Sequence, residues 1–175
     1  NFRSALNIKD TDKRPLILCS LGGITGAKFP ISLINRGKEF HWLTNMSDIT
    51  PSENIHNLDK CINWQFRDVI ASVDAVISKP GYGIAVETAA HGIPIVFFRR
   101  GDFPDEPCII EWLHQKTRAK EISIDDWFAG KIIEPVTEEI VKETCLKLKA
   151  KSSSGHDEIS TKLLTPMASP ILALV

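Results

Sequence analysis

One stretch of the chain, residues 74–100, constrains the fold more than any other. It opens with a short apolar run over 74–78 that is rich in β-branched residues, which predicts a buried strand. A glycine-rich turn follows, and then a helix of small residues over 84–91 that Gly92 should end in the left-handed conformation. Residues 95–98 predict the next strand. Together these form one βαβ unit, which places a helix N-terminus at the carboxyl edge of a parallel sheet.

The turn over 79–83 and the helix after it suggest a nucleotide site. Glu87 lies four residues after Gly83, so its carboxylate is on the same helical face, roughly 6 Å further along by helix rise. A diphosphate at the helix N-terminus would leave this carboxylate placed to accept hydrogen bonds from two adjacent ribose hydroxyls. The alternative is that the glycines only make a tight turn and that Glu87 pairs with His91 on a solvated face, because a single glycine turn is a weak signal.

A second glycine-rich turn, residues 21–26, follows an apolar run over 15–20 that predicts another buried strand. It contains Gly22 and Gly23. Because the turn lacks the full G-x-G-x-x-G pattern, it disfavours NAD binding.

The rest of the chain alternates strand and helix patterns. We therefore expect one α/β domain: a mostly parallel sheet of six strands with helices on both faces, in the doubly wound order. The strands are expected at residues 15–20, 39–44, 54–58, 74–78, 95–98 and 119–124, and the helices at 62–71, 84–91, 109–116, 125–128 and 136–149.

Several spaced motifs together resemble a known family. They are Ser78-Lys79-Pro80-Gly81-Tyr82-Gly83, then Glu87, then Gly92-Ile93-Pro94, and finally residues 99–107, RRGDFPDEP. This combination resembles the C-terminal, donor-binding domain of GT-B glycosyltransferases, with the closest likeness to the family-28 group, and it covers about residues 14–133. The fold that the resemblance implies is the Rossmann-like half of a GT-B enzyme.

The resemblance also implies a donor site. The glycine turn would face the donor diphosphate, Glu87 would hold the ribose, and the loop after the first strand would approach the phosphates. The segment before residue 66 would lie against the nucleobase. The expected donor-binding residues are Gly22, Gly23, Lys79, Gly81, Tyr82, Gly83, Glu87, Arg99, Asp105 and Glu106, with Ile62 or Trp64 at the nucleobase.

For several of these residues, a purely structural role is an alternative to donor binding. Gly22 and Gly23 also suit a simple strand-to-helix turn, and a tryptophan in the position of Trp64 is more often simply a core residue. Arg99 and Arg100 stand at the end of a strand, where they would face a phosphate or form surface salt bridges. Asp105 suits the start of a helix, because acidic residues complement the N-terminal dipole.

Two histidines, His41 and His56, lie in strand-like contexts without an evident carboxylate or cysteine partner. We interpret them as packing or surface residues rather than ligands.

Composition excludes several classes of protein. The net charge of −1 gives no electrostatic case for nucleic acid or an anionic membrane. The four cysteines are far apart, so neither a zinc site nor a disulfide scaffold is indicated, and a cytoplasmic location is the expectation. The sequence shows no signal peptide and no apolar run long enough for a membrane span. It begins with Asn1, which suggests a fragment or a processed chain.

The two ends are expected to differ from the central domain. Residues 1–13 are polar and read as a linker without core residues, ahead of the domain over 14–133. Residues 134–175 hold a helix and then a tail that we expect to be poorly ordered. Parts of 137–175 weakly resemble the fingers region of retroelement reverse transcriptases, without the later motifs that carry the catalytic aspartates, which suggests a chimeric or truncated reading frame.

The function that the resemblance implies is the donor half of a glycosyltransferase, binding a nucleotide sugar that is UDP-linked. No cofactor or metal is expected, because helix dipoles and backbone N–H groups stabilise the leaving diphosphate and no D-x-D motif stands beside the glycine turns. The acceptor site and the catalytic base would belong to a missing N-terminal domain or a partner chain, so this chain alone should bind and not turn over. The alternatives are a non-catalytic partner subunit of a split transferase and a GT-B sugar epimerase. Only the tail suggests nucleic acid, and the near-neutral charge weighs against it.

Overall fold

The structure is a computed structural model that describes residues 2–21, 38–46, 49–61, 63–101, 103–132 and 134–137, all within one compact unit. Six strands form a single sheet in the described residues, in the order β3-β2-β1-β4-β5-β6, and every adjacent pair is parallel. The strands are β1 (Leu16–Ser20), β2 (His41–Thr44), β3 (Ile55–Asn57), β4 (Ala75–Ser78), β5 (Ile95–Phe97) and β6 (Ala119–Glu121).

The predicted fold class is confirmed. Each strand lies within the range expected from the sequence, and the order is the doubly wound one, in which the chain moves outward from β1 on one side and from β4 on the other. Leu18 of β1 is in register with Leu43 of β2 and with Val76 of β4, so β1 is fully internal.

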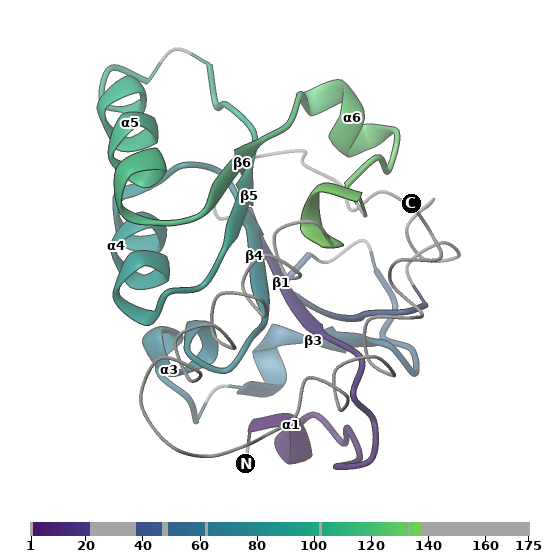
Figure 1. Cartoon of the computed structure of the whole chain (residues 1–175). Coiled ribbons are helices and arrows are strands. Elements are labelled where there is room, and N and C mark those ends of the chain that lie inside the picture. Colours follow the sequence, from purple (N-terminus) through teal and green to yellow (C-terminus); the bar gives the residue numbers. More distant parts are fainter. Residues whose placement is uncertain are drawn as a thin grey trace, which may run out of the picture. The chain divides into compact units, whose positions relative to one another are not determined.

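Helices cover both faces of the sheet. In Figure 1, α3, α4 and α5 lie on one face and α6 lies on the other. The helical elements are α1 (Phe2–Ala5), η1 (Leu58–Cys61), α3 (Phe66–Ile70), α4 (Tyr82–His91), α5 (Glu106–Lys116) and α6 (Ile124–Phe128). The helix predicted over 62–71 is therefore confined to its second half, and α4 begins two residues earlier than expected.

The core follows from this two-sided arrangement. Side chains alternate across β1: Leu16 and Leu18 join a cluster beneath α3, α4 and α5, whereas Ile17 and Cys19 join a second cluster with Trp127 of α6. Because both faces are covered, the strand reads as a continuous apolar run rather than an alternating one.

The amino-terminal segment is packed, contrary to the expectation that residues 1–13 hold no core residue. Phe2, Leu6 and Ile8 are buried in the first cluster. The guanidinium of Arg3 fixes the chain that follows by donating to the main-chain oxygens of Asp12, at 3.1 Å, and Arg14, at 2.8 Å. The prediction failed because Phe2 and Leu6, although four residues apart as on one face of a helix, lie in a segment too short and too polar for that spacing to identify a buried helix.

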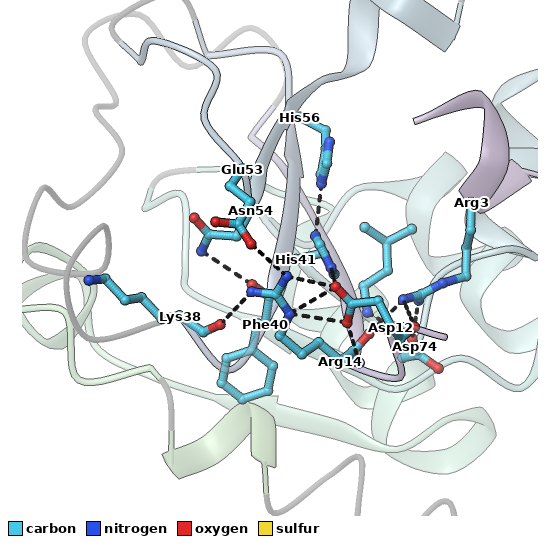
Figure 2. A network of polar contacts seen from close by, with 11 residues as sticks. Arg3, Asp12, Arg14, Lys38, Phe40, His41, Glu53, Asn54, His56 and Asp74 are labelled. Carbon is cyan, nitrogen blue, oxygen red and sulfur yellow. Dashed lines mark hydrogen bonds and ion pairs between the residues drawn. The ribbon is translucent and has the colours of Figure 1, made fainter. Parts of the chain in front are cut away.

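A polar network holds this segment to the amino edge of the sheet (Figure 2). Asp12 accepts hydrogen bonds from Arg14 Nη2, at 2.7 Å, and lies 3.0 Å from His41 Nε2, while His41 Nδ1 lies 2.9 Å from His56 Nε2. His41 is buried, so of the two readings left open, packing or surface, the packing one holds, but the view that it has no carboxylate partner was wrong. The partner is 29 residues away, and no local spacing could reveal it.

Burial and charge shift the pKa values in this network in known directions. The hydrogen bond from Arg14 is the main cause that holds the pKa of Asp12 well below its ordinary value of 3.8. Burial lowers the pKa of His41 from its ordinary value of 6.5, although the Asp12 carboxylate opposes this. Asp12 is therefore ionised and His41 is neutral near pH 7.

The carboxyl-terminal segment is described only at its start, where residues 134–137 are helical. The rest of the predicted helix over 136–149 and the tail with its reverse-transcriptase resemblance lie outside the described residues. Among the described helices, none has the length and apolar character needed to cross a membrane.

Candidate functional site

The candidate site lies where the strand order reverses, between β1 and β4. Ser20 and Ser78, the last residues of these strands, are direct register partners. The buried hydroxyl of Ser78 donates to the main-chain oxygen of Ser20 at 2.7 Å. β1 and β4 therefore end side by side at the carboxyl edge of the sheet. Gly22 and Gly23, in the first turn, lie outside the described residues.

The second turn opens α4 with free backbone donors. Gly81 is the residue before the helix, with an extended backbone and no side-chain cap, and its carbonyl accepts the first helical bond from Ala85 N–H at 3.0 Å. The N–H groups of residues 82–84 precede that bond and have no acceptor within the helix. They point outward at the carboxyl edge, where the helix dipole favours negative charge.

The glycines of this turn have no packing explanation in the described structure. A Cβ atom built at Gly81 or Gly83 would meet no atom within 4 Å, and neither residue has a positive φ. Glycine is a favoured residue at the N-cap, the position of Gly81, whereas inside a helix, as at Gly83, it is less stable than alanine by roughly 0.5–1 kcal/mol. Close approach of another molecule to the backbone is a remaining reason for glycine at position 83.

The other residues of the turn are accessible. Tyr82 is 77% exposed, and Lys79 is half-buried and forms no hydrogen bond or ion pair with the described part of the chain. Gly92 ends α4 with φ 65°, so the predicted left-handed helix end is confirmed.

Glu87 lies one turn along α4 from Gly83. His91, the partner that the alternative interpretation gives it, lies nearby. Its carboxylate is 3.7 Å from His91 Nε2, beyond hydrogen-bond distance, and about a third of the side chain is exposed. A solvated pair at this spacing is worth only about 0.3–0.5 kcal/mol, so it holds Glu87 weakly.

The expected charged residues after β5 are engaged with protein partners. Arg99 donates to Glu121 at 2.7 and 3.1 Å, which is the surface salt bridge considered as its alternative. Asp105 and Glu106 both accept hydrogen bonds from Arg100, and Glu106 is buried. Arg100 was interpreted, like Arg99, as a phosphate partner or a salt-bridge residue, and its ion pairs with Asp105 and Glu106 agree with the second alternative. The sequence did contain a signal for these contacts, because Asp105 and Glu106 follow Arg100 by only five and six residues.

The predicted nucleobase segment borders an open hollow of about 380 Å³. Trp64 lines it and packs edge-on against Phe2, with ring centroids 5.1 Å apart, so this side chain is half core and half surface. Ile62 lies outside the described residues. The hollow is lined by Leu58, Asp59, Cys61, Trp64, Phe66 and Val69.

The thiol of Cys61 in this hollow is not a nucleophile, because burial raises its pKa and keeps it protonated. In the described part of the chain, no three His, Cys, Asp or Glu side chains are grouped as metal ligands would be.

Comparisons with known proteins address the fold. No protein-family model matches the sequence, and no curated protein matches it. Solved structures do match. The glycotransferase of kitacinnamycin superimposes with a TM-score of 0.56 at 19% identity over 72% of this chain. The calicheamicin glycosyltransferase CalG4 gives 0.52 at 18% identity over 72%, and the glycosyltransferase SnogD from Streptomyces nogalater gives 0.51 at 14% identity over 81%.

The matches cover only 34%, 34% and 38% of those three chains, respectively, so this chain spans about a third of their length. The parallel sheet, its strand order and these superpositions agree: the chain has the fold of the Rossmann-like half of a GT-B glycosyltransferase.

Proposed function

We propose that this chain is the donor-binding half of a glycosyltransferase and that it binds a nucleotide sugar, UDP-linked, at the carboxyl edge between β1 and β4. The observation that carries the proposal is the uncapped N-terminus of α4, which opens from Gly81 and Gly83 into free space at the topological switch point. Open α/β sheets bind their ligands at this place.

The diphosphate belongs at the α4 N-terminus in this proposal. The N–H groups of residues 82–84 have no helical acceptor, and the positive end of the helix dipole adds about half a unit charge. Donors fixed in this way also stabilise charge on a leaving diphosphate, so we expect no divalent metal to be needed.

The two parts of the nucleoside, the ribose and the base, each have a candidate contact near the diphosphate. Glu87, a turn further along α4, is a carboxylate with only a weak partner and suits a ribose diol. The hollow beside Trp64, at the start of α3, suits a base, because α3 and α4 pack side by side. Lys79 remains a candidate for the phosphates.

Catalysis requires more than these residues. Because the chain spans about a third of the glycosyltransferases that it superimposes on, we infer that acceptor binding and the catalytic base come from another domain or another chain. The latter case is the partner subunit of a split transferase. This chain alone should bind donor without turnover, and glycosyl transfer should appear only when the second component is added.

Calorimetric titration of the chain with UDP, with and without EDTA, tests the proposal. We expect weak binding that EDTA leaves unchanged. No heat of binding at millimolar UDP, or an absolute requirement for magnesium, would contradict the proposal.

The variant Glu87→Gln tests the ribose contact, and His91→Gln is its matched control. If Glu87 holds the diol, the glutamine variant should bind UDP more weakly by about 1.5–3 kcal/mol with little change in stability. His91→Gln removes the same surface pair and should leave affinity unchanged. The 2′,3′-dideoxy analogue of UDP should bind the wild type and Glu87→Gln about equally. Equal losses of affinity in the two variants would instead assign the effect to the pair.

A further inference from the structure

His41 lies in the middle of a chain of polar contacts at the amino edge of the sheet, the edge opposite the candidate site (Figure 2). Its Nε2 lies 3.0 Å from Asp12 Oδ2, and its Nδ1 lies 2.9 Å from Nε2 of His56 on the edge strand β3. The side chain of His41 is only 3% exposed, so these two contacts take the place of water at both ring nitrogens.

The hydrogen positions along this chain follow from Asp12. Its carboxylate accepts from Arg14 Nε, Arg14 Nη2 and the Arg14 main-chain N–H, so it is ionised and has no proton to give to His41. Nε2 of His41 therefore carries the hydrogen and donates it to Asp12, which leaves a lone pair on Nδ1 of the neutral imidazole. That lone pair accepts the hydrogen that Nε2 of His56 must then carry.

The two imidazoles face each other along a line. Their ring centroids are 5.1 Å apart and their facing nitrogens 2.9 Å apart, so both nitrogens lie between the rings, close to the line that joins the centroids. A zinc ion on that line would hold the nitrogens about 4 Å apart, because each Zn–N bond is about 2.0–2.1 Å. The observed spacing is instead that of a hydrogen bond, so the pair shares a proton rather than a metal.

This pair can hold one added proton without losing its contact. A proton on Nδ1 of His56 leaves both hydrogen bonds of His41 in place. A second proton must go to Nδ1 of His41, and it would set two N–H groups against each other at 2.9 Å. Burial lowers the pKa of His41 from its ordinary value of 6.5, so this second proton binds below pH 6.5.

The charged groups around the pair adjust the pH of that second step. The Asp12 carboxylate favours a charged His41, whereas the guanidinium groups of Arg14 and Arg3 oppose it. Two further carboxylates of the network lie beside these arginines, Glu53 at 3.5 Å from Arg14 and Asp74 at 3.9 Å from Arg3. The conflict between the two N–H groups does not depend on these charges, because it arises from the contact between the rings.

The strand that this contact holds is the least supported of the sheet. β3 has three residues and lies at the edge, with β2 as its neighbour in the described sheet. It continues directly into η1, which lines the hollow beside Trp64. Loss of the contact between His41 and His56 should therefore loosen this edge while β1 and β4 stay paired.

We propose that His41 and His56 form an acid-sensitive latch on β3: the latch is closed while the two rings carry no added proton or one, and it opens when both are charged, which releases β3 from β2 locally. The inference does not depend on the proposed function.

Amide hydrogen exchange of the 175-residue chain at pH 7 and pH 5 tests the latch. Protection factors, which correct for the intrinsic effect of pH on exchange, should fall about tenfold for the β3 amides of the wild type at pH 5, as expected for the loss of one hydrogen bond. The amides of β4 should change by less than about twofold, because the opening is local.

The variant His56→Gln separates the latch from other effects of acid. A glutamine amide has a donor and an acceptor and can turn either one toward Nδ1 of His41, so the contact survives in both protonation states. Protection of β3 should then stay within about twofold between the two pH values. His114→Gln is the matched control, the same change at an exposed histidine of α5, and it should keep the wild-type response.

The imidazole nitrogens of the wild type provide a second measurement, which also serves if His56→Gln does not fold. Nitrogen-15 spectra should show His41 as the Nε2–H tautomer at pH 7, and its Nδ1 should gain a proton over the same pH range in which β3 opens.

Four results would overturn the inference. The first is a wild type whose β3 is equally protected at both pH values, and the second is a His56→Gln variant that opens as much as the wild type. Equal opening of β3 and β4 would assign the effect to the whole domain. A proton on Nδ1 of His41 while β3 stays protected would show that the contact tolerates the second charge.

Discussion

Asp12→Asn is the change that most directly tests how the amino-terminal segment is held to the sheet. The carboxylate of Asp12 accepts from Arg14 Nε, Arg14 Nη2 and the Arg14 main-chain N–H, and it lies 3.0 Å from His41 Nε2. Asparagine keeps the shape of the side chain and removes its charge. It also replaces one carboxylate oxygen, an acceptor, with an NH2 group, a donor that would face the N–H donors of Arg14.

The expected loss has two parts of different size. The pair with Arg14 is partly exposed, at 29% and 23% for the two side chains, so we assign it only about 1 kcal/mol. The contact with His41 is shielded, because the imidazole is almost fully buried, and it should contribute about 1–2 kcal/mol. The free energy of unfolding should therefore fall by about 2–3 kcal/mol at pH 7.

The loss should depend on pH in a defined way. The pKa of Asp12 is lower in the folded chain than its ordinary 3.8, so its stabilisation is present above that pH and declines as the pH falls below it. The pKa of His41 is lowered from 6.5, so the unfolded chain binds its proton first and stability falls as the pH drops below 6.5.

The difference between wild type and Asp12→Asn combines these effects. The Asp12 carboxylate raises the pKa of His41, and removing it should deepen the acid loss of the variant. The gap in unfolding free energy should therefore widen as the pH falls from 6.5 and narrow again below about 3.8.

Urea unfolding followed by tryptophan fluorescence at several pH values measures this gap. Asp59→Asn is the control, because that carboxylate is exposed and the change should stay within about 0.5 kcal/mol. A gap for Asp12→Asn below about 1 kcal/mol at pH 7, or one that is the same at every pH, would refute the account of Asp12 as a charged anchor.

Three further predictions concern other parts of the fold. Gly92→Ala should lower the free energy of unfolding by about 1 kcal/mol, because the residue has φ 65°, and an unchanged value in thermal unfolding would mean that the turn relaxes at no cost. Ser78→Ala should lower the free energy of unfolding by about 1 kcal/mol and weaken UDP binding, since its hydroxyl joins β4 to β1; unaltered affinity in calorimetry would show that the proposed site tolerates the loss of this hydrogen bond. Deleting residues 152–175 should leave the melting temperature nearly unchanged, as the Ser-Ser-Ser-Gly break predicts, and a fall of many degrees would show that these residues pack on the domain.

The sheet could be predicted from the sequence because its signals are local. Short β-branched runs bounded by glycine and proline identify buried strands, and the alternation with helices fixes a parallel order. The left-handed end of α4 is predicted by a local signal as well, a glycine at position 92 after a run of helical residues. These features are properties of neighbouring residues, and the structure confirms them.

The contacts of charged residues could not be predicted, because they join residues that are distant in the sequence. Arg99 donates to Glu121, which is 22 positions away, and His41 contacts Asp12, which is 29 positions away. The pairing of Glu106 with Arg100 is closer, but the burial of its carboxylate depends on how the loop folds back. For the candidate site, the sequence predicted helix α4 and its N-terminus at the carboxyl edge of the sheet, whereas the partners of Arg99 and Glu106 became known only from the structure.

The junction between β1 and β4 has a consequence for how the chain folds. The strands β1, β2 and β3 form one half-sheet from consecutive segments, and β4, β5 and β6 form the other. Ser20 and Ser78, which join the halves, are 58 residues apart in sequence, so their pairing requires a long loop to close before the contact contributes. We expect the halves to assemble first and to join late. The carboxyl edge at which β1 and β4 meet exists only after that step, so a nucleotide that binds there, as proposed, should slow unfolding and leave the refolding rate unchanged.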